Sequence, residues 1–202
     1  TRRFGASLEK IKQVVDVREG EIMFGLNMIV HKGKTIFVGD TSVHEYPTSE
    51  QMAEMAISTA RVVKLFGFEP KVAFVSHSTF GQPLTSRTKH IRKAVDILKE
   101  KKVDFEFDGD MQPDVALSSE YEELYPFSKI VGKANILIMP GQHSAAISYK
   151  MMKTFGDAKV IGPLLIGLGL PIEIAPLRSS TSELINLASI AAYSADVIDY
   201  KK

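Results

Sequence analysis

Val72-Ala73-Phe74-Val75-Ser76-His77-Ser78 is typical of a buried strand of apolar residues that ends in three polar ones. A helical pattern follows from Ser86 to Lys101. Strands that alternate with amphipathic helices indicate a largely parallel sheet with helices on both faces. The stretch therefore predicts an α/β fold.

The same alternation extends in both directions along the chain. Before it we expect a helix at 1–16, a hairpin of strands at 22–30 and 35–38, and a helix at 49–66. After it we expect a strand around Phe105, short helices around Val115 and Tyr121, a strand at 136–139, a helix at 144–155, strands at 160–166 and 172–175, and a last helix at 182–198. No internal repeat interrupts this order.

The composition limits the class of protein. With 202 residues, 45% of them hydrophobic, the chain can bury one sizeable domain or two small lobes. A net charge of +1 argues against nucleic-acid binding, and the absence of cysteine suits a reducing cytoplasm. The longest apolar stretch, 160–175, is short and is interrupted by prolines and Glu173, so we expect no membrane span. Because the chain starts at Thr1, we expect it to be a piece of something longer.

Ligands of open α/β sheets bind beyond the carboxyl ends of the strands, so the strand-to-helix loops are the candidate site. Four such loops carry hydroxyl side chains: 39–48, 76–85, 140–144 and 176–181. Thr41, His44, His143 and Ser144 could point into the crevice, although turn and capping roles explain each of them equally well. The five histidines are scattered, and we predict no metal site.

The loop before the last helix has the strongest physical signal. Ser180 and Glu183 have capping-box spacing, which places free backbone N–H groups beside Arg178 and Ser179. Such a helix start next to a guanidinium favours phosphate. The alternative is that Ser180 only caps the helix while Arg178 pairs with a surface carboxylate.

The loop Ser76-His77-Ser78-Thr79-Phe80-Gly81 offers several hydrogen-bond donors for an anion. A catalytic triad with Asp108 is rejected, because adjacent Ser and His do not fix the required geometry. The basic residues that follow are expected to form a solvated face rather than a phosphate clamp: Arg87, Lys89, His90, Arg92 and Lys93.

Two further segments bear on the fold and on the ligands that this chain can bind. Residues 104–108 alternate acid and aromatic side chains, which is typical of an edge strand with one wet face. Gly167-Leu168-Gly169 lacks the third glycine of a dinucleotide fingerprint, so we expect no NADP site in this chain.

Four motifs then resemble, in order and spacing, the phosphate acetyl/butyryltransferase family. They are Val72 to Gly81, Phe107-Asp108-Gly109-Asp110-Met111-Gln112, Lys133 to Pro140, and Ile161 to Leu168. The resemblance begins at about Val17. Asp40 to Thr48 and Ile190-Ala191-Ala192-Tyr193 are most similar to the branch formed by the carboxy-terminal domains of hybrid NADP-dependent malic enzymes.

The resemblance implies a three-layer α/β/α sandwich with a mostly parallel sheet, of the isocitrate/isopropylmalate dehydrogenase-like type. It also implies two lobes with a cleft between them for coenzyme A and acyl phosphate. Residues 1–20 would be a connector helix, 21–175 the second lobe, and 176–202 a helix that returns to a first lobe whose remainder is missing. The residues implied to bind acetyl-CoA or acyl phosphate are Ser76, His77, Ser78, Thr79, Phe80, Gly81, Asp108, Gln112, Gly162, Pro163, Arg178, Ser179 and Ser180.

One departure from the family pattern bears on catalysis. Active members carry a serine directly before the cleft arginine and an aspartate six residues after it, whereas this chain has Leu177 and Leu184. Arg178 keeps its charge, but the general base is lost, so we expect no catalytic residue here. A positioned base contributes about 10²- to 10⁴-fold to a rate.

The resemblance therefore implies a regulatory domain that binds acetyl-CoA as an effector and inhibits a linked malic enzyme. NADP and a divalent Mg or Mn ion would bind only the missing amino-terminal part. The alternative is an active phosphate acetyltransferase with Asp108 or Asp110 as its base. We also expect a homo-oligomer, because the last helix has an apolar stripe that needs a cover.

Overall fold

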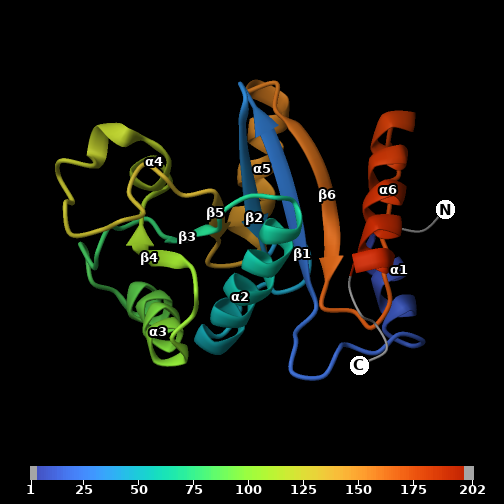
Figure 1. The fold of residues 1–202 in the computed structure, drawn as a ribbon, viewed down its shortest axis with the longest axis horizontal. Coiled ribbons are helices and arrows are strands. Elements are labelled where there is room, and N and C mark those ends of the chain that lie inside the picture. The colour runs from blue at the N-terminus through green and yellow to red at the C-terminus, as the bar shows by residue number, and fades with distance from the viewer. Residues whose placement is uncertain (1–3, 198–202) are drawn as a thin grey trace.

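The computed structural model describes residues 4–197, and its centre is one six-stranded sheet with the order β4-β3-β5-β2-β1-β6 (Figure 1). The strands are β1 (Phe24–His31), β2 (Lys34–Gly39), β3 (Lys71–Val75), β4 (Glu106–Met111), β5 (Ile136–Ile138) and β6 (Lys159–Ile166). β2, β5, β3 and β4 are parallel, while β1 is antiparallel to both of its neighbours, β2 and β6. The predicted mostly parallel sheet is confirmed.

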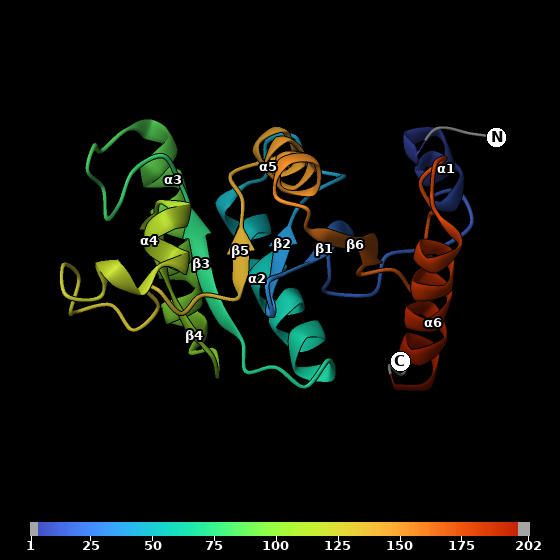
Figure 2. The same ribbon diagram turned by 90° about the horizontal axis from the view of Figure 1, so that it is seen from above.

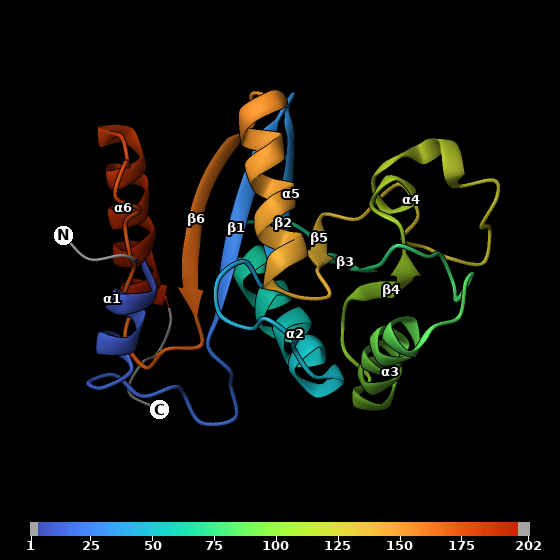
Figure 3. The same ribbon diagram turned by 180° about the vertical axis from the view of Figure 1, so that it is seen from behind.

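Helices cover both faces of this sheet. The helices of the described residues are α1 (Phe4–Ile11), α2 (Ser49–Leu65), α3 (Ser86–Lys101), α4 (Pro113–Leu117), α5 (Gln142–Phe155) and α6 (Thr181–Val197), with a 3-10 turn at Ser119–Tyr121. Apolar residues of α2 and α3 pack on one face, and those of α4 and α5 pack on the other. Figure 3 shows α5 in front of this part of the sheet, where it contacts β2 and β6. The three-layer α/β/α expectation is therefore confirmed.

Two helices stand at one end of the molecule, away from this sandwich. α1 and α6 lie side by side beyond β6 in all views (Figures 1 and 2). Leu8 of α1 belongs to a small separate core with Leu165 and Leu168, whereas Leu187 is the buried residue of α6. α1 corresponds to only part of the connector helix predicted at 1–20. Residues 1–3 of that connector and residues 198–202 of the predicted returning helix lie outside the described residues.

The predicted strand at 172–175 is wrong. This segment lies between Pro171 and Pro176 and forms no sheet ladder, although Ile174 is buried. The backbone amide of Leu165 in β6 instead donates a 3.0 Å hydrogen bond to the carboxylate of Glu173. A side chain thus occupies a place at the sheet edge where a strand was expected. No helix among residues 4–197 is long and apolar enough to cross a membrane.

Candidate functional site

The loops after β2, β3 and β5 surround an open cavity of about 590 Å³, which we call the strand-end cavity. Its polar lining residues are Glu45, Tyr46, Ser76, His77, Arg87, His143, Ser144 and Ser148. Val75, Met139 and Pro140 supply apolar surface. The cavity lies at the carboxyl ends of parallel strands, as expected for a ligand site in such a sheet.

Two contacts define one side of the strand-end cavity. The guanidinium carbon of Arg87, in the first turn of α3, lies 5.1 Å from the ring centroid of Tyr46. His143, at the start of α5, pairs with Glu45 at 3.1 Å between Nε2 and Oε1. A cation held over an aromatic face keeps its charge available at the mouth of the cavity.

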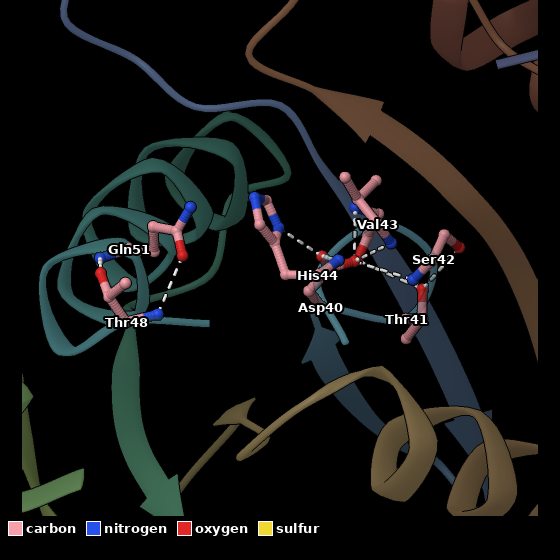
Figure 4. A network of polar contacts seen from close by, with 8 residues as sticks. Asp40, Thr41, Ser42, Val43, His44, Thr48 and Gln51 are labelled. Carbon is pink, nitrogen blue, oxygen red and sulfur yellow. Dashed lines mark hydrogen bonds and ion pairs between the residues drawn. The ribbon is translucent and has the colours of Figure 1, made fainter. Parts of the chain in front are cut away.

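The loop from Asp40 to Thr48 is held by one buried carboxylate. Oδ1 of Asp40 accepts hydrogen bonds from the backbone amides of Gly25 at 2.9 Å, Ser42 at 2.8 Å and Val43 at 3.1 Å. Its Oδ2 contacts the amide of His44 at 2.6 Å and Nδ1 of the same residue at 2.7 Å. Figure 4 shows these contacts converging on Asp40.

The capping box of Thr48 and Gln51 then starts α2. A carboxylate with this many donors fixes a loop firmly. The loop that carries Glu45 and Tyr46 to the cavity is therefore preorganised. Thr41 points away from the crevice toward the sheet, since its hydroxyl donates to the side chain of Asn27 at 2.7 Å.

A second buried carboxylate holds the loop 76–81. Asp110 accepts a hydrogen bond from the hydroxyl of Ser78 and another from the amide of Gly81 at 3.0 Å. The side chains of Ser78 and Asp110 are both fully buried. Because both of its oxygens have partners, Asp110 orders the loop and is poorly placed to act as a general base.

The predicted site residues of this loop thus line two different cavities. Ser76 and His77 line the strand-end cavity, whereas Thr79 and Phe80 line a different hollow together with Gln112. Asp108 lies outside both, on β4, with its carboxylate accepting from the amide of Gly109 at 2.9 Å.

The predicted residues around α6 form a separate group. Arg178 is exposed and is not part of the cavity wall. Gly162 and Ser179 meet at a narrow gap of about 10 Å³, beside the buried Leu187. Pro163 follows Gly162 in β6.

The capping role of Ser180 is confirmed. The amide of Glu183 donates to the Ser180 hydroxyl at 3.2 Å, and the amide of Ser180 donates to the Glu183 carboxylate at 2.7 Å. Lys153 of α5 also reaches Glu183, at 2.9 Å. These contacts hold the pKa of Glu183 down to about 2.

Sequence reasoning did not select Arg87 or Tyr46 as site residues. Arg87 is exposed, as the solvated-face interpretation expects, but it also lines the strand-end cavity. Its partner is 41 positions away in the chain, so no spacing rule connects them. Within residues 4–197, no three His, Asp or Glu side chains gather in a way that could hold a metal ion.

Comparison with known proteins gives the same fold and names the family. The chain matches the phosphate acetyl/butaryl transferase family over residues 2–192. It is 44% identical to an NADP-dependent malic enzyme of Rhizobium meliloti, over 96% of this chain and 26% of that protein. It is 33% identical to a phosphate acetyltransferase of Bacillus subtilis, over 91% of this chain and 57% of that protein.

A solved phosphotransacetylase from Streptococcus pyogenes has a TM-score of 0.88 at 27% identity, over 96% of this chain and 60% of that one. The chain spans about a quarter of the length of the malic enzymes it matches. Because the family match covers almost all of the sequence, the chain belongs to the phosphate acetyl/butaryl transferase family.

Proposed function

We propose that this phosphotransacetylase-like domain binds acetyl-CoA, inhibits a linked NADP-dependent malic enzyme that converts malate to pyruvate and carbon dioxide, and does not itself transfer acyl groups. The observation that carries the proposal is the strand-end cavity, where Arg87, His77 and hydroxyl side chains stand beside apolar surface. Coenzyme A combines phosphates with an apolar thioester arm. A cavity with both kinds of surface suits such a ligand.

The region around Arg178 supports the lack of catalysis. Leu177 and Leu184 occupy the places where active members of the family carry a serine and an aspartate, and both leucines are exposed. Asp110, the candidate replacement base, is engaged by Ser78 and Gly81. Binding survives the loss of a base more readily than proton transfer does.

Regulation requires that acetyl-CoA bind two states of the larger protein with different affinity, and such coupling is typically about 1–3 kcal/mol. The high identity to malic enzymes supports a linked oxidoreductase as the regulated partner. NADP and a divalent Mg or Mn ion would belong to that part, and a cytoplasmic location would suit the substrates. The exposed Ile185, Tyr193 and Val197 of α6 support the expected homo-oligomer.

The test is calorimetric titration of acetyl-CoA into the full-length protein and into its Arg87→Ala and Arg178→Ala variants. Saturable heat in the wild type is expected. Weaker binding in Arg87→Ala would place the phosphates at the strand-end cavity, and weaker binding in Arg178→Ala would bring the start of α6 into the same site. Absence of heat in the wild type rejects the proposal.

The second candidate is an active phosphate acetyltransferase, which the 33% identity to the Bacillus subtilis enzyme favours. The two candidates differ in one assay, the formation of acetyl-CoA from acetyl phosphate and coenzyme A. Turnover well above the buffer rate, abolished by substitution of Asp108, would establish the enzyme and exclude a purely regulatory domain.

A further inference from the structure

An aromatic hollow of about 420 Å³ is lined by Thr79 and Phe80 of the loop 76–81 and shares no lining residue with the strand-end cavity. Its rings are those of Phe80, Tyr125 and Phe127. The centroid of Phe80 lies 4.8 Å from that of Phe127 and 5.4 Å from that of Tyr125. Three rings in mutual contact form a wall on which a further flat ring can stack.

The wall is open to solvent. Phe127 is 69% exposed and Leu124, also in the hollow, is 67% exposed. Large apolar side chains grouped in this way mark binding surfaces more often than isolated ones do. The hollow therefore presents ring surface that nothing in residues 4–197 covers.

The backbone at Phe80 is held in an unfavourable conformation. Its φ of 50° lies in the left-handed region, which bulky residues avoid. The amide of Phe80 donates a 2.6 Å hydrogen bond to the carbonyl of Asp110, and the neighbouring Gly81 donates to the carboxylate of the same residue. Strain that is maintained by surrounding bonds is typical of ligand sites. Here it fixes the ring of Phe80 in the hollow.

The polar rim of the hollow offers amide groups. Gln82 and Gln112 line it, and among the described contacts neither side-chain amide has a hydrogen-bond partner. The backbone of Gln112 is fixed by a 3.2 Å bond from its amide to the hydroxyl of Thr79. A glutamine amide has one acceptor and one donor group, which match the N6 and N7 edge of adenine. The hollow thus combines aromatic side chains with amide groups of the kind that can pair with that base.

We propose that the aromatic hollow binds the adenine ring of the coenzyme A ligand, while the strand-end cavity takes the acyl-bearing arm. This inference rests on the proposed function and adds a second subsite to it. The loop 76–81 joins the two subsites, because Ser76 and His77 face the cavity and Thr79 and Phe80 face the hollow. Arg92 packs against Gly81, with Nη1 only 2.7 Å from where a Cβ would stand, and supplies positive charge beside the shared loop.

The experiment compares two ligands in the full-length protein: coenzyme A and phosphopantetheine, which lacks the adenosine part. Phe127→Ala is expected to weaken coenzyme A binding about 5- to 150-fold, the effect of losing one base-stacking contact. The affinity for phosphopantetheine should not change. Gln112→Ala should weaken coenzyme A binding in the same ligand-selective way. Phe155→Ala is the matched control, because Phe155 is 87% exposed on α5 and is not part of the hollow.

Each outcome decides the inference. Unchanged coenzyme A binding in Phe127→Ala, or equal losses for both ligands, overturns the adenine subsite and leaves the proposed function standing. If unchanged binding is accompanied by a smaller sedimentation coefficient, the hollow is a contact between protein subunits. If the wild type binds neither ligand, the proposed function fails as well.

Discussion

Arg87 of helix α3 lies over the ring of Tyr46 in the loop after β2, with the guanidinium carbon 5.1 Å from the ring centroid. Arg87 belongs to the first turn of α3, and Tyr46 follows directly on the residues 42–44 whose backbone amides Asp40 holds. The pair therefore places a positive charge at a preorganised wall. If the proposed phosphate binds at this wall, the loop does not have to be ordered first, so that part of the binding cost is avoided.

Replacing Arg87 by alanine is expected to weaken acetyl-CoA binding about 10- to 150-fold, because a charged hydrogen bond to phosphate contributes about 1.5–3 kcal/mol. Calorimetry on the full-length protein measures this effect. Lys89→Ala is the matched control, since Lys89 is an exposed cation of the same helix and does not line the cavity. Equal losses in the two variants would indicate a general charge effect instead.

Asp110→Ala is expected to lower the free energy of unfolding by about 1.5–3 kcal/mol or more, because it leaves the hydroxyl of Ser78 and the amide of Gly81 without their acceptor. Urea denaturation measures the loss. Ser78→Ala should be milder, since it removes only one of the two donors. A fully stable Asp110→Ala variant would contradict the loop-ordering role.

Gly141→Ala is expected to destabilise the fold by more than about 1 kcal/mol and to reduce acetyl-CoA binding. Gly141 has a φ of 156°, and a Cβ there would collide with the carbonyl oxygen of Glu45. The collision would displace the loop that carries Tyr46. Gly5→Ala serves as control, because nothing lies within 4 Å of the added Cβ. Thermal melting and calorimetry on both variants separate the two effects.

Stability should depend on pH through Glu173. Burial raises the pKa of this carboxyl group from its ordinary 4.5 to about 8, only partly offset by the hydrogen bond from Leu165. Between these two values the folded protein retains a proton that the unfolded chain has lost. Stability must therefore fall as the pH rises from 4.5 toward 8, by at most about 1.4 kcal/mol per pH unit.

The Glu173→Gln variant isolates this contribution. It keeps an oxygen acceptor for the amide of Leu165 but cannot ionise, so it should be more stable than the wild type at neutral pH. The difference in the free energy of unfolding should shrink as the pH falls toward 4.5. A difference that stays constant from pH 5 to pH 8 would show that Glu173 keeps its ordinary pKa.

The order of strands and helices was predictable because each element carries its own periodic pattern. The edge position of β4 followed from the alternating acids and aromatics at 104–108. The segment 172–175 was wrongly predicted to be a strand because it is a short, partly buried apolar run. In the structure the side chain of Glu173 occupies the sheet edge instead.

The candidate site was less predictable because it depends on contacts between distant segments. The cap at Ser180 could be read from local spacing, but its distance from the strand-end cavity depends on how α6 packs. The loop-ordering role of Asp40 could not be predicted, because its hydrogen-bond donors are mostly backbone amides, which any sequence provides. The position of Arg87 in the cavity wall could not be predicted, because a helical pattern identifies an exposed face but not the ring of Tyr46 that lies against it.

The most direct test of the central claim is the rate of NADP reduction by malate in the full-length protein as acetyl-CoA is titrated in. The account predicts a saturable fall in rate, with Arg87→Ala requiring about 10 to 150 times more acetyl-CoA for the same effect. A rate that does not change while acetyl-CoA is present at millimolar concentration would contradict it.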